Sequence, residues 1–381
     1  MQMSIVIAPD SFKGSLSAAD VAQAMAKGVQ RVLPEAALTL LPLSDGGEGL
    51  VDSLVAASGG KLLEIQVTGP LGEPVTAKLG LMGNGQTAVI EMAQASGLVL
   101  VPENKRNPLV TTTFGTGELI QKALDLGCTH LIIGIGGSAT NDGGMGMAQA
   151  LGFRFFDEEG EHLGPGGGEL ARLARIDAAG KDPRLAGVVI DVACDVNNPL
   201  TGPTGAAHIY GPQKGATPEM VEILDAALAN YGGMIHRDLG QNVGKVPGSG
   251  AAGGLGAGLM ALLGGRLVSG IELVLNVLGF EAKAQGASLV LTGEGKFDAQ
   301  SAYGKVPMGV AQRARALGVP VVVVAGSVMP SAEILHGEGI TAYFSILNQP
   351  MSLKDAMEHG AELVEYQVAE VVRLFSAVNL R

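Results

Sequence analysis

The chain has 381 residues, of which 47% are apolar and only 16% are charged, and its formal net charge is −12. A chain of this length and composition can bury more than one core, which excludes collagen, low-complexity linkers and disordered chains. Nucleic acids and anionic membrane surfaces require a cationic field, so we expect neither of them as a partner.

The cysteine content and the N-terminus indicate a cytoplasmic protein. Two cysteines, Cys128 and Cys194, are too few for a disulfide framework and suit a reducing compartment. Residues 1–7 contain no basic region, and Asp10 interrupts the apolar run too early for a signal peptide. The longest stretch without charge, residues 248–265, is rich in Gly and Ala and predicts a buried segment rather than a membrane helix. The low charged fraction makes a homodimer a reasonable expectation.

The first elements alternate between strand and helix. Residues 5–8 predict a buried strand, and a second strand is predicted over 38–43. Between them, Ser17 and Asp20 have the spacing of a capping box that opens a helix over about 18–33.

A change of rhythm marks the start of a second domain. Three strand-like runs between about residues 62 and 93 are separated by turn residues at 69–72 and 83–85. Short glycine-containing turns between strands are typical of an antiparallel meander.

The rest of the chain returns to strands and helices in alternation. Strands are predicted over 130–135, 153–156, 188–192, 288–291, 319–324 and 341–346, and helices over about 117–126, 145–151, 218–231 and 354–375. This pattern predicts an α/β fold. We expect one α/β domain formed by both chain ends, residues 1–66 plus 285–381, with a second α/β domain, residues 67–284, inserted.

Loops that follow predicted strands are the first place to look for a site, because ligands collect at the carboxyl ends of strands in open α/β sheets. Five such loops are rich in Gly, acids and hydroxyls: 8–14, 44–49, 134–144, 194–199 and 292–298. Glycine allows a backbone to approach an anion closely and to direct successive N–H groups toward it. These loops therefore suit phosphate.

Phosphoryl transfer requires cations near the moving phosphate, a metal ion and a carboxylate that accepts the hydroxyl proton. Four lysines lie within glycine-rich segments: Lys13, Lys214, Lys296 and Lys305. Carboxylates that suit Mg²⁺ with a bound nucleotide lie in the same loops: Asp45, Glu48, Asp195 and Glu294. The six histidines are scattered and have no paired spacing, which disfavours a His/Cys metal site.

Two other function classes stay open. The segment 134–139 with Asp157 further on imitates a dinucleotide fingerprint, which would suit an NAD-dependent dehydrogenase of a small hydroxy acid. The loop continues to Gly144 before a helical pattern resumes, however, whereas that fingerprint needs a helix at once. The second alternative is a non-catalytic nucleotide or phosphosugar sensor on the same fold.

A standard NTPase phosphate loop is absent, since Gly304-Lys305 is followed by Val306.

Taken together, the segments resemble those of the bacterial type I glycerate kinases, over residues 5 to about 371. Eight segments in fixed order carry the resemblance: 8–18 (APDSFKGSLSA), 45–49 (DGGEG), 91–97 (EMAQASG), 134–144 (GIGGSATNDGG), 194–199 (CDVNNP), 211–215 (GPQKG), 248–254 (GSGAAGG) and 292–298 (TGEGKFD). The resemblance implies a Rossmann-like parallel-sheet domain formed by both chain ends, with a second domain inserted. It also implies a cytoplasmic enzyme that transfers the γ-phosphoryl group of ATP, with Mg²⁺, to D-glycerate, giving 2-phosphoglycerate and ADP. The 2-position rests on the resemblance alone.

Roles for individual residues follow as hypotheses. Asp10, Ser11 and Lys13 would grip glycerate, with Lys13 also serving catalysis. Asp195 would accept the proton of the attacking hydroxyl, and Asp10 is the alternative base. Asp45 and Glu48 would hold the metal. The residues expected to bind nucleotide phosphates or neutralise the transferred group are Gly136, Gly137, Ser138, Thr140, Asn141, Lys296 and Lys305.

Overall fold

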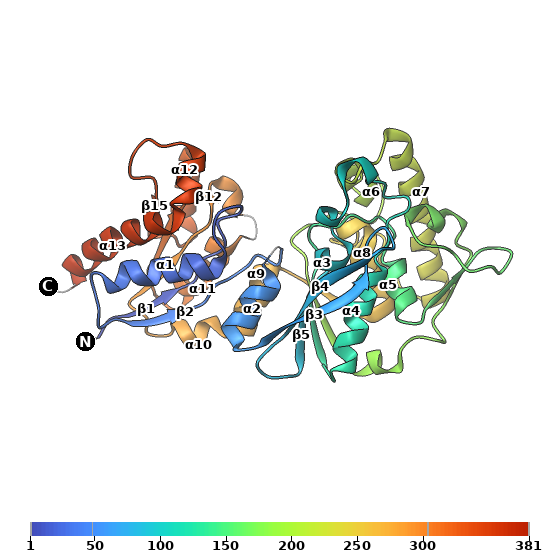
Figure 1. Cartoon of the computed structure of the whole chain (residues 1–381), viewed down its shortest axis with the longest axis horizontal. Helices are drawn as coiled ribbons and strands as arrows, with labels where there is room; N and C mark the ends of the chain where they lie inside the picture. The colour runs from blue at the N-terminus through green and yellow to red at the C-terminus, as the bar shows by residue number, and fades with distance from the viewer. Residues whose placement is uncertain (1, 48, 303–304, 380–381) are drawn as a thin grey trace. The chain divides into compact units, whose positions relative to one another are not determined.

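The computed structural model describes residues 2–47, 49–302 and 305–379, and the chain divides into two compact units (Figure 1). The first unit contains residues 1–45, 56–58 and 271–381, and the second contains residues 46–55 and 59–270. Each unit has its own sheet and its own hydrophobic core. The predicted α/β class is confirmed.

The first unit is built on a parallel sheet of strands in the order β15–β13–β11–β1–β2. The strands are β1 (Ser4–Ile7), β2 (Ala37–Leu40), β11 (Leu289–Thr292), β13 (Val321–Ala325) and β15 (Ala342–Ser345). Counted along this unit, the order is 2-1-3-4-5, a doubly wound order of the flavodoxin type rather than the 3-2-1-4-5-6 order of a Rossmann sheet. The strand order reverses between β1 and β11.

Helices cover the sheet of the first unit, whose central strands are fully buried, as parallel strands usually are. The helices are α1 (Ala18–Gln30), α9 (Gly270–Leu278), α10 (Phe280–Ala284), α11 (Val306–Ala316), α12 (Leu353–Glu358) and α13 (Gly360–Asn379). Short elements complete the unit: β12 (Lys296–Phe297), β14 (Ser327–Val328), and the 3-10 helices η6 (Ala299–Ala302) and η7 (Pro330–Glu338). Ser17 caps α1 as predicted, because the Asp20 amide donates to Ser17 Oγ at 3.1 Å, and Ser17 Oγ in turn donates to Asp20 Oδ2 at 2.6 Å.

Helices α1 and α13 lie side by side (Figure 1), and Gly28 allows their close approach. A Cβ at Gly28 would lie 2.5 Å from the Glu365 carbonyl oxygen. The prediction of one C-terminal helix over 354–375 is wrong, since the helix is broken between α12 and α13. Ser15 Oγ donates to the Met357 carbonyl at the break, at 2.8 Å, and a Cβ at Gly360 would lie 3.0 Å from the same hydroxyl.

The second unit contains a mixed sheet in the order β10–β9–β6–β5–β4–β3. Its strands are β3 (Lys61–Thr68), β4 (Pro74–Leu81), β5 (Thr87–Glu91), β6 (His130–Gly134), β9 (Val189–Ala193) and β10 (Arg266–Val268). Strands β3, β4 and β5 are antiparallel neighbours, which confirms the predicted meander, and β5, β6, β9 and β10 are parallel. The predicted strand over 153–156 exists as β7 (Arg154–Phe156), but it pairs only with β8 (Arg175–Asp177), outside this sheet.

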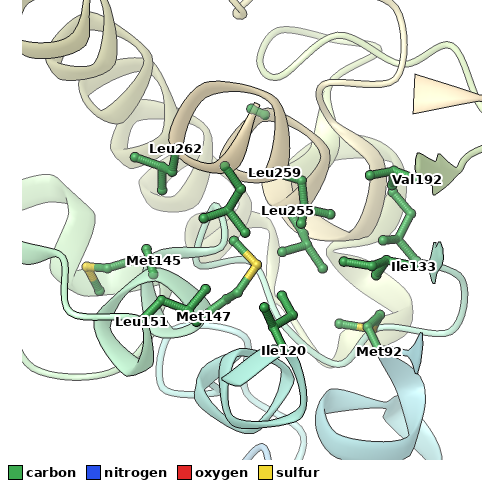
Figure 2. Packing of buried hydrophobic residues seen from close by; sticks show 14 of the residues in the cluster. Met92, Ile120, Ile133, Met145, Met147, Leu151, Val192, Leu255, Leu259 and Leu262 are labelled. Carbon is green, nitrogen blue, oxygen red and sulfur yellow. The ribbon is translucent and has the colours of Figure 1, made fainter. Parts of the chain in front are cut away.

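Helices and 3-10 turns surround this second sheet. They are α2 (Leu50–Ser58), α3 (Ala93–Ser96), η1 (Leu98–Leu100), η2 (Glu103–Lys105), α4 (Phe114–Asp125), α5 (Met145–Ala150), η3 (Gly167–Arg172), η4 (Pro183–Gly187), α6 (Ala206–Tyr210), η5 (Pro212–Lys214), α7 (Pro218–Leu239) and α8 (Ala251–Leu263). Figure 2 shows how side chains of α4, α5 and α8 point toward those of β6 and β9, with Ile120, Met147, Leu259 and Ile133 among them. The uncharged segment over 248–265 is largely buried, as predicted.

The junctions of the two units differ from the domain boundaries expected at 66/67 and 284/285. Strand β3 pairs with β4 along its whole length, which ties residues 61–66 to the second sheet. Helix α9 belongs to the first unit, because it packs against α11: a Cβ at Gly309 of α11 would lie 2.4 Å from Ile271 Cγ1 of α9. The junctions therefore fall after Asp45 and after Gly270. Among the residues described, no helix is both long and apolar enough to span a membrane.

Candidate active site

Two of the predicted loops meet at the switch point of the first sheet. Strands β1 and β11 are parallel neighbours, so residues 8–14 and 292–298 leave the sheet at the same edge. The Asp10 amide donates to the Gly293 carbonyl at 2.8 Å, and Thr292 Oγ1 donates to the Ala8 carbonyl at 2.7 Å. In open α/β sheets this crevice is where ligands bind.

Asp10 is the acid at the centre of this edge. Only 6% of the residue is exposed, and the Ser11 amide donates to Oδ1 at 2.6 Å. Burial, and after it the negative charge of Asp45, raise the pKa of Asp10 to about 7; Glu294 adds to the rise, while the Ser11 amide and Lys13 oppose it. A carboxyl with such a pKa can accept a proton near neutral pH.

Lys13 and Asp45 form a loose ion pair at the same edge. Lys13 Nζ lies 3.9 Å from Asp45 Oδ2, and 66% of the lysine side chain is exposed. An exposed pair at this distance contributes little to stability. The ammonium group can therefore turn toward an incoming anion at little cost.

The loop after β11 supplies two further acid–lysine pairs. Glu294 is buried, and its two carboxylate oxygens accept hydrogen bonds from Ser301 Oγ and from Lys305 Nζ, the latter at 3.1 Å. Burial raises the pKa of Glu294, and Lys305 partly offsets the rise. Lys296 Nζ lies 3.0 Å from Asp298 Oδ2. Both predicted phosphate-neutralising lysines of this unit thus have carboxylate partners.

The acids at this edge fit a divalent cation that is shared with phosphate. After burial, the negative charges of Asp45 and Glu294 both contribute to the raised pKa of Asp10. No group of three or more His, Cys, Asp or Glu side chains within the described ranges could hold a metal ion alone. Mg²⁺ usually takes one or two carboxylates and completes its shell with water and substrate phosphates. Asp45 is accordingly a fitting ligand, whereas Glu48 lies outside the described residues.

In the second unit, the glycine-rich loop over 135–144 follows β6. Gly136 and Gly137 are exposed, whereas Ser138, Thr140 and Asn141 are buried. The loop is pinned from one side by the segment after β5: the Ala139 amide donates to the Ser96 carbonyl at 2.9 Å, and the Leu98 amide donates to the Gly137 carbonyl at 2.8 Å.

The side chains of this loop that are expected to bind nucleotide phosphates, Ser138, Thr140 and Asn141, are all buried. Among the described residues, Thr140 Oγ1 and both polar side-chain atoms of Asn141 have no hydrogen-bond partner. Segment 252–254 covers them from the other side, where Gly253 stands so close that a Cβ would lie 2.0 Å from the Thr140 carbonyl oxygen. Of the loop residues 135–144, only Gly136 and Gly137 are exposed to solvent.

Asp142 holds the far end of the loop. It is fully buried and accepts hydrogen bonds from the Thr113 amide and hydroxyl, both at 2.8 Å, and from the amides of Gly144 and Gly146. Burial raises the pKa of Asp142, against the effect of these bonds. Asp142 thereby orders the start of α5, a role that sequence reasoning missed.

Asp195 occupies the carboxyl end of β9. It is exposed, and its Oδ1 accepts a hydrogen bond from the Gly270 amide at 2.9 Å. Nearby, Gly46 packs on the same strand end, since a Cβ there would lie 2.8 Å from Ala193 Cβ. The chain thus enters the second unit beside the end of β9.

Glu91 is another residue that sequence reasoning left without a role. It ends β5, is buried, and its Oε1 accepts a hydrogen bond from the Val51 amide at 2.9 Å. A carboxylate at the first turn of a helix satisfies amides that lack a partner within the helix. Glu91 therefore fixes the start of α2 and, with it, the end of the loop over 44–49.

The dehydrogenase alternative does not fit this geometry. Asp157 follows β7, which is not a strand of the large sheet, and its carboxylate pairs with Arg172. Helix α5 begins only at Met145, well beyond the fingerprint glycines. A Rossmann dinucleotide site needs an acid at the end of the neighbouring strand and a helix directly after the glycines.

Fold and site together define an α/β enzyme whose doubly wound sheet gathers acids and lysines at its switch point. The sequence profile of the Glycerate kinase family matches residues 5–376. The chain belongs to this family and is a kinase.

Individual relatives agree along almost the whole chain. A glycerate kinase of Bacillus subtilis is 53% identical over 369 residues, which cover 97% of each chain. A glycerate 2-kinase of Escherichia coli is 53% identical over 354 residues, 93% of each chain. A crystal structure from Salmonella typhimurium LT2, provisionally described as glycerate kinase 2, is 49% identical and superposes over 100% of both chains with a TM-score of 0.92.

Proposed function

We propose that the protein transfers the γ-phosphoryl group of ATP to the 2-hydroxyl of D-glycerate, giving 2-phosphoglycerate and ADP. The observation that carries the proposal is the buried carboxyl of Asp10 at the switch point, where Lys13, Asp45 and Glu294 are close enough to affect its pKa. Phosphoryl transfer needs a proton acceptor, cations and positioned oxygens, and little else from the protein.

In this reaction Asp10 accepts the proton of the attacking hydroxyl. The hydroxyl oxygen forms a bond to the γ-phosphorus while the bond to the bridging oxygen of ADP breaks, and the proton ends on the carboxylate of Asp10. The buried Asp10, with its pKa of about 7, suits this role better than the exposed Asp195, which is already hydrogen-bonded to Gly270. Asp195, the base expected from the sequence, becomes the alternative.

Lys13 and Ser11 bind the glycerate carboxylate and hydroxyls in this proposal. Lys13 is exposed and only loosely paired, so its ammonium group can reach an anion. Lys296 and Lys305 neutralise charge on the transferred group. Each lysine is oriented by one acid, Asp298 or Glu294, which keeps the ammonium group in place before the substrate arrives.

A bound Mg²⁺ would supply positive charge that neutralises the charge developing on the phosphate oxygens. Asp45 would be its protein ligand, and Glu48 stays a predicted one. In the second unit, the loop over 136–141 would bind nucleotide phosphates through its backbone amides, with Ser138 as the side-chain donor nearest the exposed glycines. Glycines and a following helix are the usual means of binding phosphate. The buried Thr140 and Asn141 would shape the loop from below. A cytoplasmic location and a homodimer stay predictions.

The proposal is tested by incubating the enzyme with D-glycerate, ATP and Mg²⁺ and measuring ADP release in a coupled assay. Phosphorus NMR of the product then distinguishes phosphate on the 2-hydroxyl from phosphate on the 3-hydroxyl. Binding of ATP and glycerate without ADP release would favour the sensor alternative. Nicotinamide reduction in a parallel absorbance assay with glycerate would favour the dehydrogenase.

A further inference from the structure

Lys214 is the one lysine of the described residues that is buried, with 1% of the residue exposed. Lysine is almost never fully buried without a specific partner. Here Nζ donates to Ser138 Oγ at 2.8 Å and to the Thr140 carbonyl at 2.6 Å. Both acceptors belong to the glycine-rich loop, more than 70 residues away in the sequence.

The turn that carries Lys214 is built to direct it inward. Pro212 opens the short helix η5, and Gly215 ends it with φ of +93°. A Cβ at Gly215 would lie 2.5 Å from the Arg106 carbonyl oxygen, so only glycine fits there. Gly211 is equally confined, because a Cβ would lie 2.3 Å from the Ala207 carbonyl oxygen. The segment GPQKG therefore fixes the backbone on both sides of the lysine.

The two contacts hold the loop at both sides of Ala139. Because the ammonium group donates to Ser138 Oγ, the hydroxyl must direct its own hydrogen elsewhere and can donate it to an anion. When protonated, the amine also places positive charge within hydrogen-bond distance of Ser138 and Thr140, in buried surroundings where charge is weakly screened. Burial lowers the pKa of Lys214 to about 7, and the carboxylate of Asp142 opposes that fall.

We propose that Lys214 is a positioning residue for nucleotide binding: it holds the loop over 136–141 in its anion-binding shape and, when protonated, brings positive charge to that loop. This inference rests on the proposed nucleotide role of that loop. A lysine that served only the stability of the core would affect both substrates alike, whereas a positioning lysine affects the nucleotide selectively.

The test compares K214M, K214R and the control K181M, which makes the same change at an exposed lysine of the same unit. Kinetic constants for ATP and for D-glycerate are measured, together with ADP binding by calorimetry. We expect K214M to raise the KM for ATP and the Kd for ADP by about tenfold or more, with the KM for glycerate changed less than about twofold. K214R, which keeps the positive charge and the hydrogen-bond donors on a larger side chain, should recover part of the nucleotide affinity that K214M loses. K181M should match the wild type.

Two results separate the inference from the function on which it rests. Failure of the wild-type protein to bind ADP or ATP would remove the proposed nucleotide role. Wild-type binding with an unchanged nucleotide KM in K214M, or an equal loss for both substrates that K214R does not restore, would overturn the role of Lys214 alone.

If K214M folds poorly, calorimetry on K214R decides. Phosphate seated on the loop stabilises the protonated lysine, so ADP binding near pH 8 should draw a proton onto Lys214 in the wild type. Asp142 is the charged group that faces the ammonium, and Arg106 packs behind the turn; neither changes in K214R. A guanidinium does not titrate in this range, so K214R should take up fewer protons on ADP binding than the wild type does. Equal proton uptake by the two proteins would overturn the inference.

Discussion

The amide of Asp10 donates to the carbonyl of Gly293 at 2.8 Å, beyond the last residues of strands β1 and β11. This bond joins two loops from opposite ends of the chain at the point where the strand order reverses. It places the carboxyl of Asp10 within electrostatic reach of Glu294, at the edge of the sheet where Lys13 and Asp45 also lie. The acid most suited to accept a proton is thus fixed by the backbone of the sheet itself.

Replacement of Asp10 by Asn should remove the proton acceptor while keeping the shape of the side chain. We expect kcat to fall by roughly 10²–10⁴-fold, with a much smaller change in the KM for ATP. D195N, measured in parallel, should lose less turnover, because Asp195 is exposed. D20N, an exposed acid of the same unit, should stay within about twofold of the wild type. A larger loss in D195N than in D10N would transfer the role of base to Asp195.

The pKa of Asp10 also predicts a pH-dependent difference in stability. The folded protein raises this pKa from 3.8 to about 7, so between these values the native chain holds a proton that the unfolded chain has lost. Stability from this group is therefore complete below about pH 4 and is lost as the pH rises through 7. D10N cannot ionise, so it should gain stability over the wild type with rising pH, by up to about 4 kcal/mol at pH 8.

Urea unfolding of both proteins at pH 4, 6 and 8 measures this difference. Other titrating groups are shared by the two proteins and cancel. A stability difference that is the same at all three pH values would show that Asp10 has an ordinary pKa.

Much of the fold could be predicted because it follows local rules. Strand β13 is a run of valines, and the turn residues at 69–72 and 83–85 indicate the antiparallel pairing of the meander. The unpredicted features depend on contacts between distant segments. The break before α13 lies where Ser15 meets Met357; Gly360 beside the break is a local signal, but the contact with Ser15 is not visible in the local sequence. Similarly, β7 has the composition of a sheet strand, yet its partner is found only in β8.

The site divides in the same way. Loops after strands could be predicted as sites, because the carboxyl edge of a parallel sheet is a general binding place. The sequence could not predict which side chains of those loops face solvent, since Thr140 and Asn141 are covered by a segment that lies more than a hundred residues later in the chain. Lys214 and Glu91 were visible in the sequence only as members of motifs; their partners, Ser138 and the Val51 amide, come from the folded chain.

The Mg²⁺ dependence of turnover should be due in part to Asp45. Removal of divalent cations with EDTA should abolish turnover, and addition of Mg²⁺ should restore it. D45N should raise the Mg²⁺ concentration needed for half-maximal rate by about tenfold, with the rate recovering at high Mg²⁺, because one carboxylate ligand is lost. D52N, an exposed acid paired with Lys78, is the control and should leave this concentration unchanged. An unaltered Mg²⁺ requirement in D45N would exclude Asp45 as a ligand.

Gly253 provides a test of how tightly the glycine-rich loop is packed. It lies in a left-handed run at the start of α8, with φ of +68°, and its carbonyl accepts a hydrogen bond from the Gly143 amide at 3.0 Å. A Cβ here would lie 2.0 Å from the Thr140 carbonyl oxygen and 2.6 Å from Asn141 Cα, so the loop or the helix start must move. G253A should therefore lower nucleotide affinity as well as stability.

Gly127 is the matched control, because it has a similar φ of +78° but open space around its missing Cβ. Both substitutions strain a left-handed backbone, which costs about 1 kcal/mol, so the difference between them isolates the contact with the loop. We expect urea unfolding to show G253A at least about 2 kcal/mol less stable than G127A, and ADP calorimetry to show weaker binding only in G253A. If the two variants are equally stable and bind ADP equally well, Gly253 does not support the loop, and the left-handed run at the start of α8 serves the fold of the helix alone.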